Sequence, residues 1–141
     1  MHSVTSQLRV RYAETDQMGV VYHANYVIWM EIGRVEYFRA QGVRYSDLER
    51  DEGILLVVVE AHCRYHSPAR YDDEVLVKTW LQEANPRMIR FGYEITEATT
   101  GRHMATGETK HVFCGPDYKP KKLPEKYRGA FGIVPHQAPD A

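Results

Sequence analysis

The sequence is poor in cysteine, has no long hydrophobic run and carries no surplus of either charge. Its longest apolar run, residues 54–59, has the length of a strand, whereas a membrane-spanning helix needs about 20 apolar residues. The 18 Lys and Arg residues balance 19 Asp and Glu residues, for a net charge of −1. This balance argues against binding to nucleic acid, because contacts to phosphates require clustered positive charge. Residues 1–11 show no basic start followed by an apolar stretch, so no secretory signal is predicted.

The two cysteines, Cys63 and Cys114, are too few for a framework of several disulfides. We expect free thiols in a reducing compartment and therefore a cytoplasmic protein. What the chain does contain is an ordinary globular composition, with 43% hydrophobic and 26% charged residues over 141 positions. This length and composition predict one domain over residues 1–131 and a flexible C-terminal tail over residues 132–141.

Hydrophobic periodicity predicts a mixed α and β structure. Residues 7–13 alternate apolar and charged side chains, as a half-buried strand does. Residues 23–42 contain no proline and end in glycine, which favours one long helix, and residues 46–52 favour a short second helix. The prolines of residues 115–128 indicate an extended surface segment. Short turns separate four further predicted strands, which are therefore antiparallel: residues 54–66, 74–83, 88–96 and 103–114.

The predicted long helix has no clean polar face. Apolar residues cover most of its circumference, and the charged residues are spread around it: Glu31, Arg34, Glu36 and Arg39. A helix of this kind is usually enclosed by other structure, here most simply by a sheet that curls around it. Its charges then need partners, because unpaired buried charge is costly. For Glu31 the expected partner is Arg34, three residues further along the helix.

A polar loop over residues 14–19 places the acidic residue Asp16 shortly before this helix. Gly19 permits a tight backbone path and the close approach of a ligand. The first amides of a helix are free and can receive an oxygen that becomes negative during acyl transfer. A carboxylate beside such amides is a minimal hydrolytic site. The alternative is that Asp16 only makes a turn hydrogen bond, as loop aspartates commonly do.

Three motifs stand in order along the chain: Tyr12-x-Glu14-Thr15-Asp16-x-x-Gly19-x-Val21-Tyr22-x-x-x-Tyr26, Tyr65-x-x-Pro68-Ala69-x-x-Asp72-Asp73 and Lys119-Pro120-x-x-Leu123-Pro124. Together they resemble the signature of the 4-hydroxybenzoyl-CoA thioesterase family of hotdog-fold acyl-CoA thioesterases. The resemblance is closest to the bacterial branch associated with the Tol-Pal system. It covers nearly the whole chain, from about residue 8 to residue 131.

The resemblance implies an α+β hotdog fold, in which a five-stranded antiparallel sheet wraps around one long central helix. It implies a homo-oligomer, either a dimer or a dimer of dimers (a homotetramer), with active sites at the subunit interface. It also implies an acyl-CoA thioesterase that needs neither metal nor cofactor, so that coenzyme A enters only as part of the substrate and leaves as product. Acyl groups carried by acyl-carrier protein are a further possible substrate.

The resemblance assigns roles to particular residues of the first motif. Asp16 takes the position of the catalytic aspartate, and the backbone amide of His23 takes that of the oxyanion donor. The substrate-binding segment comprises Gly19, Tyr22, Asn25 and Tyr26.

Asn25 raises an alternative for the start of the helix. As an N-cap, it would begin the helix two residues after His23 and would move the oxyanion donors to Val27 and Ile28. A helix that starts near Tyr22 keeps the His23 amide as the donor, and this is the assignment that we adopt.

The phosphates of coenzyme A require cations near the pocket mouth. Arg87 and Arg90 follow a predicted turn, and Lys119 lies in the proline-containing segment with Lys121 and Lys122, so these residues are the candidates. Each of them could equally be a solvated surface charge.

Other site chemistries and functions were weighed against this one. His62 and His66 lie about 13 Å apart along a predicted strand, too far to bind one metal ion together. Glu31, on the long helix, is an alternative catalytic carboxylate. The rival functions are a hotdog dehydratase or hydratase, a non-catalytic acyl-CoA or acyl-carrier-protein binding module, and a scaffold near the cell envelope.

Overall fold

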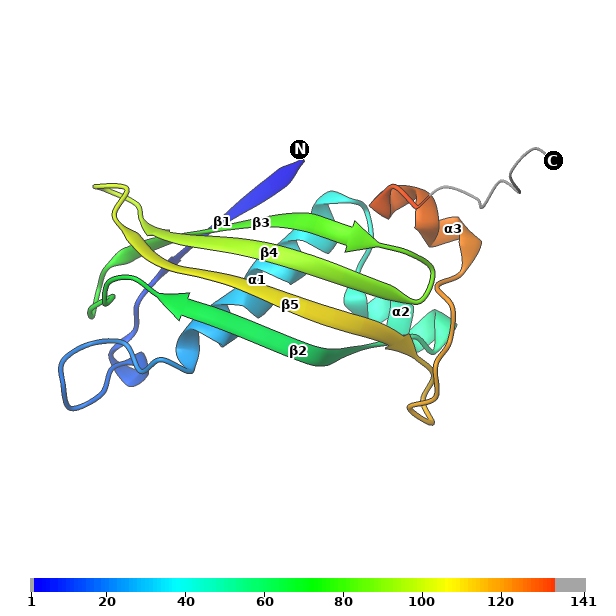
Figure 1. Ribbon diagram of the computed structural model, residues 1–141, viewed down its shortest axis with the longest axis horizontal. Helices are drawn as coiled ribbons and strands as arrows, with labels where there is room; N and C mark the ends of the chain where they lie inside the picture. The colour runs from blue at the N-terminus through cyan, green and yellow to red at the C-terminus, as the bar shows by residue number, and fades with distance from the viewer. Residues whose placement is uncertain (1, 134–141) are drawn as a thin grey trace.

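The computed structural model describes residues 2–133 and shows one antiparallel sheet curled over a long helix (Figure 1). The five strands lie in the order β1-β3-β4-β5-β2, so that β1 and β2 form the two edges. They are β1 Ser3–Arg9, β2 Leu55–Tyr65, β3 Glu74–Ala84, β4 Met88–Glu97 and β5 His103–Cys114. The predicted five-stranded antiparallel sheet is therefore confirmed.

The long helix α1, Asn25–Ala40, lies on one face of the sheet (Figure 1). The remaining helical segments are α2, α3 and two 3-10 turns, which span Tyr45–Glu52, Glu125–Arg128, Tyr12–Glu14 and Gly129–Phe131. Among the described residues, no helix is both long enough and apolar enough to cross a membrane.

The sheet and α1 pack closely because apolar side chains alternate along the strands. Trp29, Met30 and Phe38 of α1 are fully buried in the core against the inner face of the sheet. The helix lies close to β3 at Gly33, where an added methyl group would collide with the side chain of Thr79. A glycine at this position therefore sets how near the helix can come to β3.

A chain of hydrogen-bonded polar side chains crosses this interior. Arg34 Nη1 donates to the Tyr93 hydroxyl over 3.3 Å, and that hydroxyl lies 2.6 Å from Thr109 Oγ1. Thr109 Oγ1 in turn lies 2.8 Å from His111 Nε2. Burial, together with the nearby Arg34 charge, lowers the pKa of His111 to about 3, so this imidazole is neutral. The predicted pair of Glu31 with Arg34 was wrong, because Glu31 is exposed and Arg34 turns inward to Tyr93.

The sheet covers only one face of α1. Val27, Ile28 and Ile32 on the opposite face are exposed in the single chain. The prediction of an enclosed helix therefore holds for the sheet-facing side, and the other side presents apolar surface to solvent.

Several predicted boundaries differ from the structure. The first strand ends at Arg9, four residues early, because residues 12–14 turn back as a 3-10 helix. Two hydrogen bonds close this turn, from Arg11 N–H to the Glu14 carboxylate and from Glu14 N–H to the Arg11 carbonyl. Helix α1 begins at Asn25, two residues late. The predicted extended segment contains the short helix α3. Of the predicted tail, residues 134–141 lie outside the described residues, whereas Ile133 is buried in the core cluster.

Candidate active site

The loop that carries Asp16 is a tight turn closed by its own backbone. Asp16 N–H donates to the Val20 carbonyl over 2.9 Å, and Gly19 N–H donates to the Asp16 carbonyl over 3.0 Å. Gly19 has φ +79°, a left-handed conformation that favours glycine. Asp16 Oδ1 accepts from Met18 N–H over 2.9 Å, so the turn hydrogen bond that we considered as an alternative does exist. Within residues 2–133 no hydrogen bond reaches Oδ2, which leaves that oxygen available for chemistry.

The start of α1 is held by backbone hydrogen bonds. Tyr22 N–H donates to the Glu14 carbonyl (2.8 Å), and Asn25 N–H donates to the Tyr22 carbonyl (2.9 Å). The Asn25 side chain does not cap the helix, because its Nδ2 donates back to the Glu14 carbonyl over 2.9 Å. The amides of His23 and Ala24 have no hydrogen-bond partner among the residues of the described chain. These two N–H groups are therefore free to bind an oxygen of a ligand.

Glu14 ties the loop to the helix, a role that the sequence analysis missed. Its carboxylate is buried and accepts from the Trp29 indole N–H (2.7 Å) and from Arg11 N–H (2.7 Å). Burial alone would raise the pKa of Glu14, but these hydrogen bonds and the Arg11 charge outweigh it and lower the pKa below its usual value. A sequence signal did exist, because the buried indole of an inward-facing tryptophan needs an acceptor.

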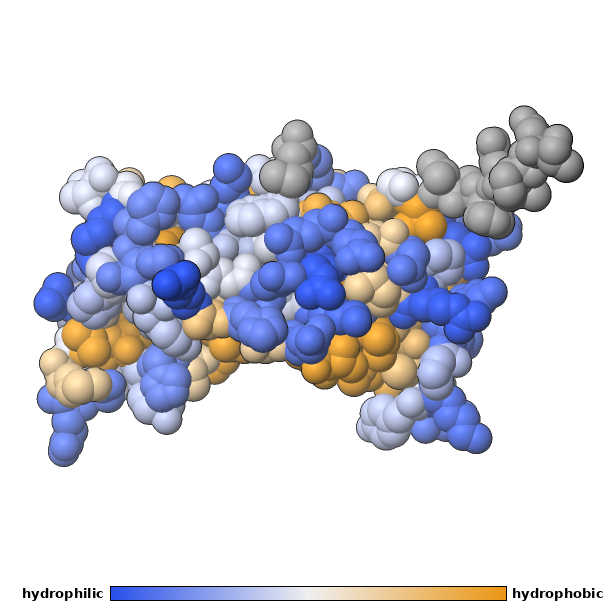
Figure 2. Space-filling view, in the orientation of Figure 1, coloured by the Kyte–Doolittle hydropathy of each residue, from blue (hydrophilic) through white to orange (hydrophobic). Residues whose placement is uncertain are grey.

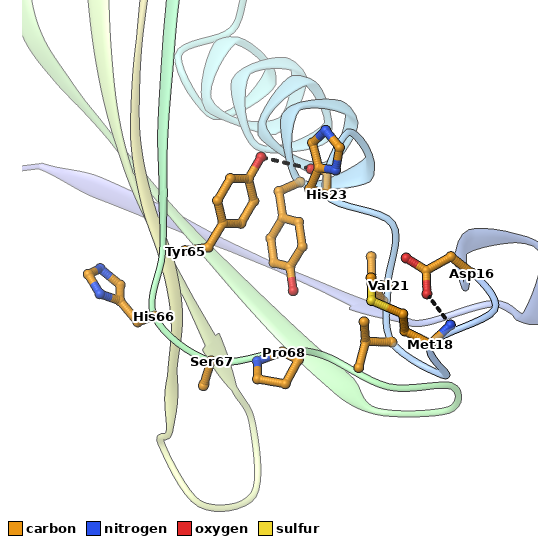
Figure 3. A pocket seen from close by; sticks show the side chains of 10 residues that line it. Asp16, Met18, Val21, His23, Tyr65, His66, Ser67 and Pro68 are labelled. Carbon is orange, nitrogen blue, oxygen red and sulfur yellow. Dashed lines mark hydrogen bonds between the residues drawn. The ribbon is translucent and has the colours of Figure 1, made fainter.

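A pocket of about 320 Å³ opens beside these elements. Figure 3 shows Asp16 and Tyr65 on opposite sides of it, with His23 between them at the start of α1. The residues that line it come from the loop, the first turn of α1 and the end of β2: Asp16, Met18, Val20, Val21, His23, Tyr26, Tyr65, His66, Ser67 and Pro68. An apolar cavity with a few convergent polar groups is typical of a small-molecule site.

Two tyrosines form the inner wall of the pocket. Tyr26 is buried, and its hydroxyl accepts from Ala69 N–H over 3.1 Å. Tyr65 lies edge-on to Tyr26 with 5.1 Å between ring centroids, and its hydroxyl donates to the His23 carbonyl over 2.9 Å. Tyr65 belongs to the second sequence motif, but the sequence analysis gave it no role, because a contact between residues 42 positions apart leaves no local pattern.

The structure brings together only some of the predicted site residues. Asp16, His23 and Tyr26 line the pocket. Gly19, Tyr22 and Asn25 belong to the same segment, but they shape it and do not line the cavity. Gly19 permits the turn, and Asn25 bonds to Glu14. The exposed Tyr22 ring lies tilted beside the His23 ring, with 4.5 Å between ring centroids.

Within one chain, the predicted phosphate-binding residues Arg87, Arg90 and Lys119 all lie away from this pocket. Arg90 is on the outer face of the sheet, where it contacts three carboxylates: Glu108 at 2.7 Å, Glu83 at 3.7 Å and Glu60 at 3.9 Å. These carboxylates already neutralise its charge, so Arg90 does not suit a phosphate.

Arg87 and Lys119 lie at the far end of β5. The Arg87 carbonyl bonds to Phe113 N–H and the Lys119 carbonyl to Gly115 N–H. The pocket lies near Ala105, which pairs with Tyr65. Eight residues of strand separate Ala105 from Phe113, or about 26 Å. Neither cation can therefore reach the pocket of its own chain.

Comparisons with known proteins agree with this fold. A family model described as the thioesterase-like superfamily matches residues 10–131. The Bacillus subtilis protein YneP is 44% identical over 95 residues, which cover 67% of this chain and 68% of YneP. Acyl-CoA thioesterase YbgC of Haemophilus influenzae is 32% identical over 124 residues, which cover 88% of this chain and 90% of YbgC. The crystal structure of DHNA-CoA thioesterase from Staphylococcus aureus matches with a TM-score of 0.89 at 32% identity, over 94% of this chain and 90% of that one.

A curled five-stranded sheet, a central helix and an acidic loop before that helix define a hotdog domain with a hydrolytic type of site. The chain belongs to the thioesterase-like superfamily. The predicted resemblance to hotdog-fold thioesterases, and with it the predicted class of thioester hydrolase, is confirmed.

Proposed function

We propose that this protein hydrolyses acyl-CoA thioesters to a carboxylic acid and coenzyme A, with Asp16 as the reacting carboxylate. The observation that carries the proposal is that Asp16 and His23, whose N–H has no partner within residues 2–133, line one pocket. A carboxylate and an amide donor at one cavity are the two groups that acyl transfer to water requires. The acyl-CoA substrate named for the YbgC relative supports the choice of thioester.

In the proposed reaction, the thioester carbonyl oxygen accepts hydrogen bonds from the amides at the start of α1. The carboxylate of Asp16 then acts in one of two ways. As a nucleophile, it attacks the carbonyl carbon, the C–S bond breaks with its electron pair on sulfur, and water hydrolyses the resulting mixed anhydride. As a general base, it takes a proton from a water that attacks the same carbon. Both routes consume one water and release the acid and coenzyme A.

The proposed chemistry needs no metal ion and no cofactor. A thiolate is a good leaving group, and charge stabilisation by fixed backbone amides acts on the oxyanion. Coenzyme A takes part only as a portion of the substrate and as a product. We propose the cytoplasm as the setting, where the free thiols of Cys63 and Cys114 would persist.

We also propose that the active unit is a homo-oligomer formed through β2. This strand is at a sheet edge, and its Val58 and Val59 are 48% and 47% exposed. Figure 2 shows apolar surface along that edge. A long edge strand with exposed apolar residues is a template for pairing with another chain. The exposed side of α1, with Ile28 and Ile32, offers a second apolar surface for a dimer of dimers.

Pairing through β2 would also bring cations to the pocket. If two copies pair antiparallel, the Tyr65 end of one β2 lies beside the Leu55 end of the other. Leu55 is next to Cys114 in the sheet, so Arg87 and Lys119 of the partner subunit would approach the pocket mouth. The phosphates of coenzyme A could then bind across the two subunits.

A thiol-release assay across acyl-CoA chain lengths, with Asp16→Asn beside the wild type, tests the proposed function. Asparagine keeps the oxygen that accepts from Met18 N–H, so we expect the variant to fold and its kcat to fall about 10²–10⁴-fold. Asp117→Asn is a matched control, because Asp117 Oδ1 makes the same type of turn with Lys119 N–H at 3.0 Å.

Addition of EDTA should leave the rate unchanged. Retained hydrolysis in Asp16→Asn would remove Asp16 from the mechanism. Tight acyl-CoA binding by the wild type without thiol release would favour a binding module instead.

A further inference from the structure

Tyr65, the last residue of β2, contacts the start of α1 across the pocket. Its hydroxyl donates to the backbone carbonyl of His23 over 2.9 Å, and Figure 3 shows this bond spanning from the strand to the helix. The Tyr65 ring packs edge-on against Tyr26 and His23, with centroid distances of 5.1 and 6.1 Å. Within residues 2–133, no other side chain makes a hydrogen bond to the backbone of His23 or Ala24.

The start of α1 lacks the support that most helices have. Its N-cap position is Ala24, whose side chain cannot accept a hydrogen bond, whereas Ser, Thr, Asp or Asn commonly fills this position and binds the free amides. The absence of a capping side chain leaves the amides open to a ligand. Asn25 anchors the first turn through its side chain, but that side chain bonds to the Glu14 carbonyl and not to the peptide of His23 and Ala24. Tyr65 supplies a side-chain bond to this peptide from the neighbouring strand.

The Tyr65 hydrogen bond helps to fix the direction of an amide, together with a longer bond of 3.3 Å from Tyr26 N–H to the same His23 carbonyl. The His23 carbonyl and the Ala24 N–H belong to one planar trans peptide and point in opposite directions. The Tyr22 carbonyl and the His23 N–H likewise share one peptide, so the bond from Asn25 N–H to the Tyr22 carbonyl orients the His23 N–H. Neither peptide can rotate without breaking the hydrogen bonds that its carbonyl accepts. The Tyr65 bond is made by a side chain, so a substitution can remove it without changing the backbone.

The hydroxyl of Tyr65 remains a donor at neutral pH. Partial burial, followed by the nearby Cys63 and Tyr26, raises the pKa of Tyr65 to about 12. The group therefore holds its proton throughout the range in which the enzyme would be assayed, and its effect is one of geometry.

We propose that Tyr65 is a positioning residue that holds the Ala24 amide at the start of α1 in the direction needed to bind the thioester oxyanion. This inference rests on the proposed function. Catalytic donors must be held close to their productive geometry, and a shift of about 1 Å can cost about 100-fold in rate. Tyr65 acts through the peptide of His23 and Ala24, not on the reacting atoms themselves.

Tyr65→Phe tests this inference, because it keeps the ring and its packing and removes only the hydroxyl. We expect kcat to fall about 10- to 100-fold, KM to change less than about threefold and the pH profile of kcat to keep its shape. In NMR spectra of the folded variant, the amide signals of His23 and Ala24 should shift or broaden. The amide readout does not depend on turnover.

Tyr93→Phe is the matched control. It also removes one tyrosine hydroxyl with hydrogen bonds, to Thr109 and Arg34, but in the core away from the pocket. We expect it to lower the melting temperature and to leave kcat and the His23 and Ala24 amide signals unchanged. Equal losses of kcat in the two variants would overturn the inference.

Wild-type kcat in Tyr65→Phe, or a change in KM alone, would also overturn the inference while the proposed function stands. A wild-type protein that hydrolyses no acyl-CoA would overturn the proposed function first, and the inference with it.

Discussion

Replacing Glu14 with glutamine should destabilise the fold, because this carboxylate joins the loop that carries Asp16 to α1. It accepts two charge-assisted hydrogen bonds, from Trp29 Nε1 and Arg11 N–H, both at 2.7 Å. Such bonds contribute about 1.5–3 kcal/mol each. Glutamine would keep one of them as a weaker neutral bond and would set its NH₂ group against the other donor. We therefore expect the free energy of unfolding at neutral pH to fall by about 2–4 kcal/mol.

The loss should depend on pH in a defined direction. The pKa of Glu14 is lower in the folded protein than the ordinary value of 4.5. Its ionised form therefore stabilises the fold fully above pH 4.5, and this contribution is lost as the pH falls from there through the folded-state pKa. The difference in unfolding free energy between wild type and Glu14→Gln should be constant near neutrality and should shrink in acid.

Urea unfolding at a series of pH values, followed by tryptophan fluorescence, measures this difference. Glu49→Gln is the control, because Glu49 is exposed on α2 and should give a difference near zero at every pH. A Glu14→Gln protein as stable as the wild type at neutral pH would refute the argument. A difference in unfolding free energy that stays constant down to acidic pH would also refute the argument, because the ionised Glu14 carboxylate would then not be the source of the difference.

Two further predictions concern packing and assembly. Gly33→Ala should lower the free energy of unfolding by about 1–3 kcal/mol in a denaturation experiment, because its methyl group collides with Thr79. Gly129→Ala, which meets nothing within 4 Å and has φ −60°, should not lower it. Val58→Lys should shift the protein toward monomer in analytical ultracentrifugation and raise the KM for acyl-CoA, because a lysine on the edge of β2 opposes pairing. An unchanged oligomer in that variant would exclude β2 as the interface.

The elements of the fold could be predicted where their pattern is local. The long strands alternate with period two, and the segment without proline forms α1. The ends of elements were missed where hydrogen bonds of the folded loop decide them. The first strand stops early because Glu14 turns back to bond with Arg11, and α1 starts late because Asn25 bonds to the Glu14 carbonyl. These contacts depend on the folded loop and leave no periodicity in the sequence.

In the site, too, residues of a local motif could be predicted, whereas contacts that depend on the fold could not. Asp16 could be singled out because it belongs to a continuous motif close to the helix, and the structure places it in the pocket beside His23. Tyr65 is the last residue of β2 and lies far from His23 in the sequence, so its contact with the start of α1 depends on how that strand crosses the sheet. The carboxylates around Arg90 could not be predicted because the sequence does not show which residues share a face of the sheet. Three carboxylates from neighbouring strands surround that guanidinium.

The two acidic residues of the loop illustrate how environment separates structural from chemical roles. Glu14 and Asp16 are two positions apart, but Glu14 is buried with both oxygens engaged. Asp16 lies at the pocket, with one oxygen in the turn and no hydrogen bond within residues 2–133 to the other. A carboxylate whose oxygens all accept hydrogen bonds is a poor nucleophile and a poor base, because reaction would cost those bonds. Glu14 therefore serves to hold the loop that places Asp16 at the pocket beside His23.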